Sequence, residues 1–260
     1  MFVGFNATIN ETDIVAPGFF QHGIELYNKQ KKKAKEILEN YTLSNGVLDA
    51  SRIENDWFPS ISADVFISHA HKDRDLAISL AGWFSELFGI QSFIDSCVWG
   101  HMDDLLSAID ETYCVSQKNS DGSVLYYDYL KRNQSTAHVH MILNTALHKM
   151  IDKTECLIFL NTPNSLMLND VIEGKATASP WIYSELTFSQ LCRKRKLAEY
   201  RKHITHGTLY EYNKLEVRYD VSTDHLVTLS GNDIMSMWIQ DKMKPPYEVL
   251  DNLYTRKKVI

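Results

Sequence analysis

The chain has 260 residues, of which 44% are hydrophobic and 11% aromatic, and this is enough apolar material for a buried core. The composition excludes a largely disordered chain. The formal net charge of −6 argues against bulk binding to nucleic acid or to an anionic membrane surface, because clearly basic domains normally bind such partners. The charge still leaves room for local basic patches.

The N-terminus and the cysteines indicate the cellular compartment. The first residues lack the charged and apolar regions of a secretory signal, and no run approaches the roughly 20 apolar residues of a membrane helix. We therefore expect a cytoplasmic protein without a membrane partner. Four widely spaced cysteines form no C-x-x-C pair, which favours reduced, buried thiols over disulfides or a zinc site: Cys97, Cys114, Cys156 and Cys192.

Residues 1–60 are predicted to form a helical extension packed against the rest of the chain. Apolar residues at helical spacing indicate a helix over 23–40, and we interpret its lysine run as a solvated face. A second short helix is expected over 47–57, ended by Phe58-Pro59.

A βαβ unit begins at Asp64. The apolar run 64–67 is typical of a strand buried on both faces, and apolar residues at helical spacing follow it up to Gly89, a favoured helix stop. The next strand is expected over 90–95. Strand, helix and strand within about 30 residues predict a parallel sheet with helices on its faces.

The rest of the chain continues the α/β pattern. Residues between Asp95 and His138 form a long irregular stretch, and the tail after Pro246 is predicted to be peripheral. The further expected elements are a helix at 138–151, strands at 156–160, 215–219 and 226–229, and helices that begin after the capping residues Ser179 and Ser230.

The common catalytic signatures are absent from the sequence. There is no G-x-x-x-x-G-K-[ST], G-x-G-x-x-G, G-x-S-x-G or H-E-x-x-H, so a phosphate loop, a dinucleotide fingerprint, a nucleophile elbow and a zincin site all lack their anchor. The closest histidine pairs are two residues apart and have no third ligand nearby, so no metal site is predicted.

A candidate site is expected where the parallel strands end, because ligands bind there in open α/β sheets. This rule selects residues 68–73, residues 95–100 and the residues after Leu160. A nearby helix adds Trp181 and Glu185, four residues apart on one face. An aromatic ring beside a carboxylate suits a ligand with a ring and a sugar, although most W-x-x-x-E spacings are a packed tryptophan and a solvated glutamate.

Three motifs in order resemble Toll/interleukin-1 receptor (TIR) domains, especially bacterial ones. Residues 64–73 (DVFISHAHKD) resemble the opening strand and first loop of that family, and residues 93–100 (FIDSCVWG) look like its second strand and BB loop. Residues 179–186 (SPWIYSEL) resemble its W-x-x-x-E helix, in which the glutamate is the catalytic residue of the NAD-cleaving members.

The resemblance covers about residues 62–240. It implies a flavodoxin-like α/β domain over 61–240, with a parallel central sheet and helices on both faces, a helical N-terminal extension over 1–60 and a C-terminal tail over 241–260. The long stretch between Gly100 and His138 departs from the family pattern.

The resemblance also implies the chemistry, which is cleavage of the bond between nicotinamide and ribose in NAD⁺, with NAD⁺ as substrate and no cofactor or metal. The leaving group departs neutral, so the reaction mainly needs a fixed carboxylate that stabilises the oxocarbenium-like ribose. We assign this catalytic role to Glu185 and the aromatic wall to Trp181. The resemblance places the remaining substrate-binding residues on the first two strands and their loops: Phe66, Ser68, His69, Lys72 and Asp95.

Water attacking the ribose would give ADP-ribose, and an internal nucleophile would give a cyclic or conjugated product. Bacterial members that resemble this chain often act in defence against phage, so we expect either NAD depletion or a nucleotide signal for a separate effector protein. Self-association is expected through the BB-loop residues Val98, Trp99 and Gly100.

Two alternatives stay open. The chain could be a non-enzymatic TIR-type interaction module, in which Trp99 would be the contact. It could also be a nucleoside-processing transferase of similar α/β build, which would act on nucleosides and ignore NAD⁺.

Overall fold

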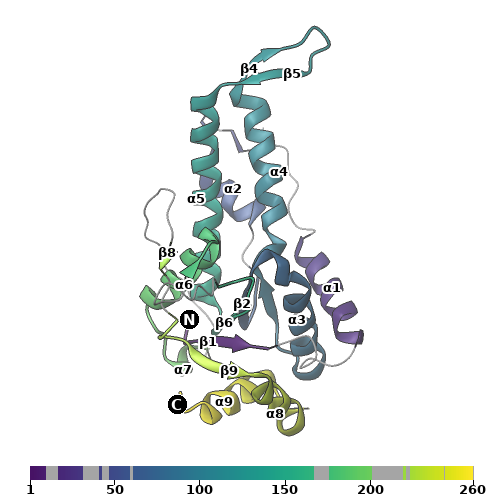
Figure 1. Cartoon of the computed structure of the whole chain (residues 1–260), viewed down its shortest axis with the longest axis vertical. Coiled ribbons are helices and arrows are strands. Elements are labelled where there is room, and N and C mark those ends of the chain that lie inside the picture. Colours follow the sequence, from purple (N-terminus) through teal and green to yellow (C-terminus); the bar gives the residue numbers. More distant parts are fainter. Residues whose placement is uncertain are drawn as a thin grey trace.

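A parallel sheet of five strands, in the order β3-β2-β6-β1-β9, stands at the centre of the protein with helices on both faces (Figure 1). This is the α/β, flavodoxin-like architecture that the sequence predicts. The strands are β1 (Val3–Thr8), β2 (Val65–Ser68), β3 (Ser92–Ile94), β6 (Cys156–Leu160) and β9 (Val227–Ser230). The computed structural model describes residues 1–9, 17–31, 41–42, 47–58, 61–166, 176–200, 219–220, 223–242 and 244–259.

The predicted βαβ unit is confirmed. Helix α3 (Arg74–Phe88) connects β2 to its parallel neighbour β3. It ends at Gly89, whose φ of +65° lies in the left-handed region that glycine adopts without strain, and the Gly89 N–H donates to the Ser85 carbonyl. The strand predicted at 156–160 is also confirmed, as β6.

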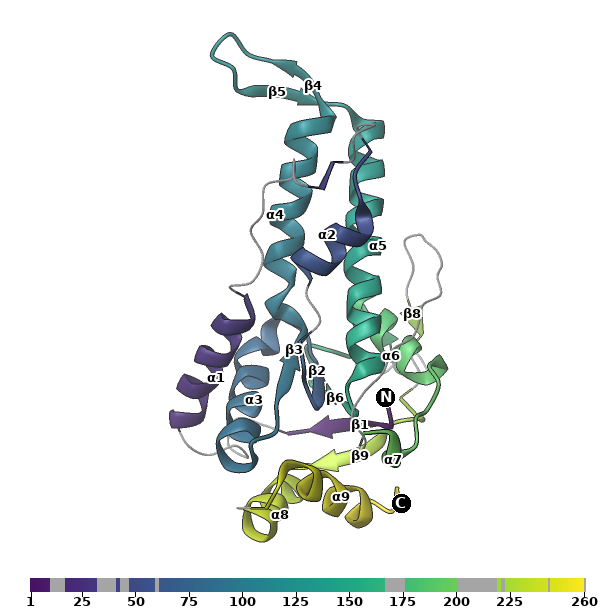
Figure 2. The same ribbon diagram turned by 180° about the vertical axis from the view of Figure 1, so that it is seen from behind.

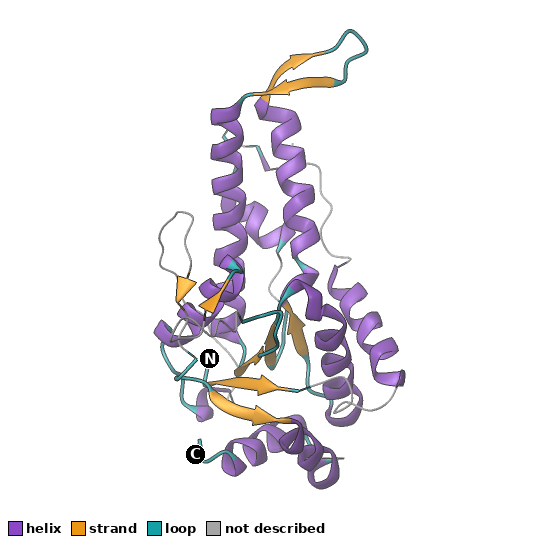
Figure 3. Ribbon diagram, viewed as in Figure 1, coloured by secondary structure: helices purple, strands orange, loops and turns teal. Residues whose placement is uncertain are grey.

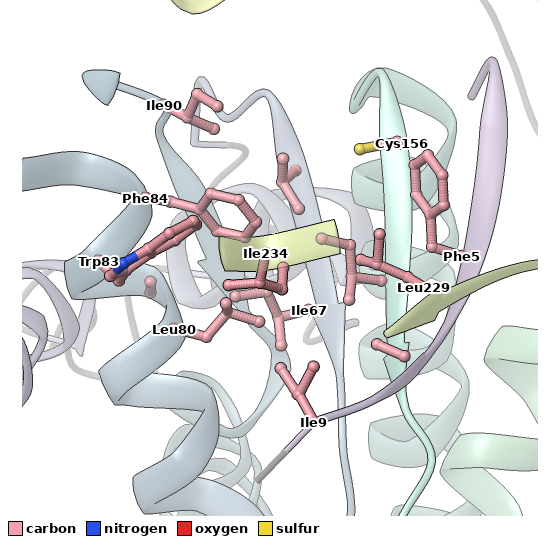
Figure 4. Packing of buried hydrophobic residues seen from close by; sticks show 14 of the residues in the cluster. Phe5, Ile9, Ile67, Leu80, Trp83, Phe84, Ile90, Cys156, Leu229 and Ile234 are labelled. Atoms are coloured by element: carbon pink, nitrogen blue, oxygen red, sulfur yellow. The ribbon is translucent and has the colours of Figure 1, made fainter. Parts of the chain in front are cut away.

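Side chains of the sheet alternate between two buried layers, which explains the uninterrupted apolar runs of its strands. Ile67 faces the layer under α1 (Pro17–Lys31), α3, α8 (Gly231–Asp241) and α9 (Pro246–Arg256). Figure 4 shows this layer, with Leu80 and Phe84 of α3 and Ile234 of α8 around Ile67. Phe66 faces the opposite layer, under α2 (Ala50–Trp57), α4 (Trp99–Ile109), α5 (Tyr129–Lys153) and α6 (Pro180–Leu191).

The predicted organisation of the N-terminal segment is wrong. Residues 3–8 are not part of an extension outside the α/β domain, because β1 pairs in parallel with both β6 and β9, and Phe5 lies between Ile158 and Val227. The helix predicted over 23–40 is observed as Pro17–Lys31, and residues 32–40 lie outside the described residues. A strand that alternates apolar residues with Gly4 and Asn6 is weak by itself and is completed by its two neighbours.

The C-terminal segment is also part of the core rather than a peripheral tail. In α9, Leu250, Leu253 and Tyr254 are at most 2% exposed. The Tyr254 ring stacks on Phe5 of β1, with centroids 6.1 Å apart. The predicted cap of α8 is confirmed, because the Ser230 hydroxyl and the Asp233 carboxylate each accept from the other's backbone N–H.

Residues 99–153 form an arm that projects away from the sheet (Figure 3). Helices α4 and α5 run side by side, and a π-helical turn (Asp110–Cys114) leads to a hairpin of β4 (Val115–Lys118) and β5 (Val124–Tyr127) at the far end. Buried Asp110 clamps the arm by accepting from Ser135 Oγ at 2.5 Å and from Arg132 Nε at 2.8 Å. The stretch predicted to be irregular is therefore largely helical.

The remaining elements are short. Strands β7 (Ala176–Thr177) and β8 (Tyr219–Asp220) form a small antiparallel pair, and α7 is a single turn (Leu197–Tyr200). Most of the strand predicted over 215–219 lies outside the described residues. Among the helices that the structure describes, none has the length and apolarity needed to cross a membrane.

Candidate active site

Helix α6 carries the W-x-x-x-E pair to the end of the sheet where β2 and β6 terminate (Figure 2). Its start follows from the sequence, since Ser179 Oγ accepts from the Ile182 N–H at 3.3 Å and Pro180 occupies the first turn. Glu185 is 1% exposed, so it is not the solvated glutamate that most W-x-x-x-E spacings contain.

Glu185 is hydrogen-bonded to the end of strand β2. The Ser68 hydroxyl, on the last residue of β2, donates to Glu185 Oε2 at 2.5 Å. These residues are 117 positions apart in the chain, and both are buried. The contact joins the first and third motifs of the TIR resemblance.

Asp95 and His69 complete the group. His69 follows β2 and Asp95 follows the neighbouring strand β3, and His69 Nδ1 lies 2.6 Å from Asp95 Oδ1. Both side chains are fully buried. We call Ser68, His69, Asp95 and Glu185 the strand-end cluster, since three of its members sit at or directly after the carboxyl ends of β2 and β3.

The cluster changes the acidity of its glutamate. Burial raises the pKa of Glu185 well above the ordinary 4.5, and the negative charge of nearby Asp95 raises it further. The hydrogen bond from Ser68 acts in the opposite direction, because it stabilises the ionised form. Glu185 therefore keeps its proton to a higher pH than an exposed glutamate does.

The other predicted substrate-binding residues differ in how far they are buried. Trp181 lies one turn before Glu185 on α6, partly buried, with its ring 5.5 Å from His140 of α5 in an edge-on contact. Phe66 lies in the core, fully buried, with its ring 5.3 Å from Phe93. Lys72 is exposed on the turn that follows β2.

The predicted BB loop is not a loop in the structure. Val98 is 6% exposed and directly precedes α4, and Trp99 and Gly100 are the first residues of that helix. The side chain of Trp99 lies outside what the structure describes. The predicted role of these residues in assembly stays a prediction.

Two hydrogen-bonded groups of polar side chains near the site were not predicted from the sequence. On α5, Asn144 Oδ1 accepts from Ser184 Oγ at 2.6 Å, and His148 Nε2 lies 2.8 Å from the same hydroxyl. Burial lowers the pKa of His148 to about 4, so the imidazole is neutral. Helix α5 therefore contacts α6 through Ser184, the residue directly before Glu185.

The second group joins the loops after β2 and β6. Asp73 accepts from Thr162 Oγ1 at 2.5 Å and from Asn164 Nδ2 at 2.6 Å. Both groups join residues at least 36 positions apart, so no local motif could have revealed them. Within the described ranges, no set of three or more His, Cys, Asp or Glu side chains could hold a metal ion.

Comparison of the chain with family models, with curated proteins and with solved structures finds no match. The TIR resemblance therefore rests on the three motifs. What the structure adds is the direct contact between residues of those motifs in the strand-end cluster.

Proposed function

We propose that this protein is a TIR-type NAD⁺ nucleosidase that cleaves the nicotinamide–ribose bond at the strand-end cluster, with Glu185 as the catalytic residue. One observation carries the proposal. The glutamate selected by the W-x-x-x-E spacing is buried at the end of β2, where it accepts from Ser68 and lies beside Asp95. Ligands of open parallel sheets bind at this edge.

The chemistry fits a site of this kind. When the C1′–N bond breaks, its electron pair neutralises the nicotinamide ring, and positive charge develops on the ribose. An ionised Glu185 stabilises that charge, and a buried setting makes the interaction stronger than it would be in water. Trp181, one turn earlier on the same helix, supplies an aromatic surface.

The fate of the ribose follows from what attacks it. Water gives ADP-ribose, and an adenine nitrogen or a ribose hydroxyl gives a cyclic or conjugated ADP-ribose. As a bacterial defence protein, the enzyme would deplete NAD⁺ or send the product to a separate effector protein.

The test is nicotinamide release from NAD⁺ by the purified full chain, followed by mass spectrometry of the products. We expect Glu185→Gln to lower the rate by about 100-fold or more, because it removes the charge that stabilises the transition state. The matched control is Glu86→Gln, on the exposed face of α3, which should retain full activity. Equal turnover by Glu185→Gln contradicts the assignment, and release of bases from neutral nucleosides without nicotinamide release selects the transferase.

The arm tip favours a second candidate function, assembly of two copies of this chain. Tyr126, Tyr129 and Leu130 are 61%, 76% and 70% exposed at the far end of the arm. Residues 113–132, at the arm tip, carry three basic and two acidic side chains, whereas the whole chain has a formal net charge of −6. Two copies that meet through their arm tips therefore repel each other less than two copies that meet through the rest of the chain. Large exposed apolar side chains gathered in this way mark contact surfaces.

This assembly has its own test, which is molar mass by light scattering as a function of concentration. We expect wild type to form dimers and Leu130→Asp to stay monomeric, because a charge cannot be buried unpaired in an apolar contact. Ile239→Asp is the matched control, since Ile239 is 71% exposed on α8, away from the arm. A Leu130→Asp variant that associates like wild type overturns this second candidate.

A further inference from the structure

Two carboxyl groups from distant parts of the chain meet inside the strand-end cluster. Asp95 follows β3, Glu185 lies on α6, and both are at most 1% exposed. Ser68 donates to Glu185 Oε2, but within the described residues neither Glu185 Oε1 nor Asp95 Oδ2 receives a hydrogen bond from an N–H or O–H donor. Because Ser68 and His69 are consecutive residues, their contacts with Glu185 and Asp95 hold the two carboxyl groups at the same strand end.

Two carboxyl groups buried at one strand end are both ionised only at a high cost in free energy. Both ionised, they would repel each other and leave acceptors unsatisfied away from water, which is costly. One proton on the pair removes the repulsion. The pKa that burial and the neighbouring charge raise is that of Glu185, so the proton lies on Glu185.

The other ionisable groups around Glu185 come from the elements packed at the cluster. His69 follows β2 and lies 2.6 Å from Asp95, and His148 of α5 contacts Ser184 and is neutral. Among the described residues, the charge that acts on the pKa of Glu185 is that of Asp95.

We propose that Asp95 is a positioning residue that holds a single proton on Glu185 in the resting cluster and so decides when Glu185 becomes a carboxylate. The proposal deepens the function above and rests on it for the substrate. A cationic nicotinamide ring entering beside Glu185 favours the ionised form, so the O–H bond of Glu185 breaks and the proton leaves to water.

The proton balance of the reaction then closes. The C1′–N bond breaks with its electron pair on nicotinamide, and water forms a bond to C1′ and gives one proton to Glu185. This step restores the resting pair. The proton expelled on binding is the one proton that hydrolysis of NAD⁺ to nicotinamide and ADP-ribose releases.

The test is the pH dependence of kcat/KM for nicotinamide release in wild type and two variants with opposite expectations. Activity of wild type should rise with pH as Glu185 ionises. Asp95→Asn removes the neighbouring charge, so the acid limb should move to lower pH by about one unit, equivalent to a tenfold gain in the ionised fraction on that limb. Ser68→Ala removes the donor that stabilises the carboxylate, so the limb should move to higher pH.

Asp73→Asn is the matched control, since Asp73 is also a buried aspartate that follows β2 but is bound to Thr162 and Asn164. It should leave the limb in place. A merely structural role of Asp95 would lower the rate at every pH without moving the limb, and that result overturns the proposal. A shift of the limb to higher pH in Asp95→Asn overturns it as well.

A second measurement separates failure of the proposal from failure of the proposed function. The free energy of unfolding of wild type should fall as pH rises above 4.5, because the folded protein binds the Glu185 proton more tightly than the unfolded chain does. The fall should be smaller in Asp95→Asn. If wild type releases no nicotinamide, the proposed NAD⁺ function fails. A smaller fall in Asp95→Asn than in wild type would then still support the proposal that Asp95 holds a proton on Glu185. An identical fall in both proteins overturns that proposal.

Discussion

Replacing Gly82 by alanine should force helices α1 and α3 apart. A Cβ atom at Gly82 would lie 1.9 Å from the Phe19 carbonyl oxygen and 2.8 Å from the Gly23 nitrogen, whereas ordinary contact begins at 3.4 Å. The helices would have to separate by about 1.5 Å to accept it. The obstructing atoms are backbone, so they cannot rotate away as a flexible side chain would.

The magnitude follows from two opposing effects. Overpacking a well-packed contact costs roughly 1–3 kcal/mol, and a rigid backbone obstacle places this site near the upper end. Alanine in place of glycine inside a helix returns about 1 kcal/mol. The net loss of about 2 kcal/mol corresponds to a fall in Tm of roughly 4–8 °C for a chain of this size.

The assay is thermal and urea unfolding followed by far-UV circular dichroism. Gly18→Ala is the matched control, because Gly18 lies on α1 with nothing within 4 Å of its Cβ position, so this variant should lose no stability. The close approach of α1 and α3 would be refuted by a Gly82→Ala protein as stable as wild type. A loss of the same size in Gly18→Ala would refute the steric explanation.

Two further stability predictions use the same unfolding assay. Leu253→Ala in α9 should lower the free energy of unfolding by roughly 2–5 kcal/mol, because Leu253 is 1% exposed and its truncation leaves a cavity. The control Ile239→Ala, at a position that is 71% exposed, should change the free energy of unfolding little. Equal effects of the two substitutions would contradict a buried α9. Ser179→Ala removes the N-cap of α6 and should cost about 1 kcal/mol, whereas Ser179→Asp, which keeps an acceptor, should restore stability if capping is the cause.

The parts of the fold that the sequence predicts well depend on local patterns. Strands β2 and β6 are apolar runs buried on both faces, and such runs are visible without a structure. Helix α3 ends at Gly89 and α6 begins at Ser179 because glycine and serine satisfy the conformation and hydrogen bonds of helix ends within a few residues.

The elements that the sequence misplaces depend on distant neighbours. β1 is a strand with a glycine and an asparagine in it, and pairing with β6 and β9 supplies hydrogen-bond partners along both of its edges. Helix α9 belongs to the core because Tyr254 packs on Phe5, at the other end of the chain. Neither contact leaves a local signal.

The candidate site shows the same division. The spacing of Trp181 and Glu185, and the polar residues after two strands, are sufficient to select one end of the sheet as the candidate site. Only the tertiary structure brings Ser68 to Glu185, joins His69 to Asp95 and leaves Phe66 in the core. The acidity of Glu185 is decided there too, because burial and a neighbouring charge are properties of the assembled site and are not encoded by any single residue.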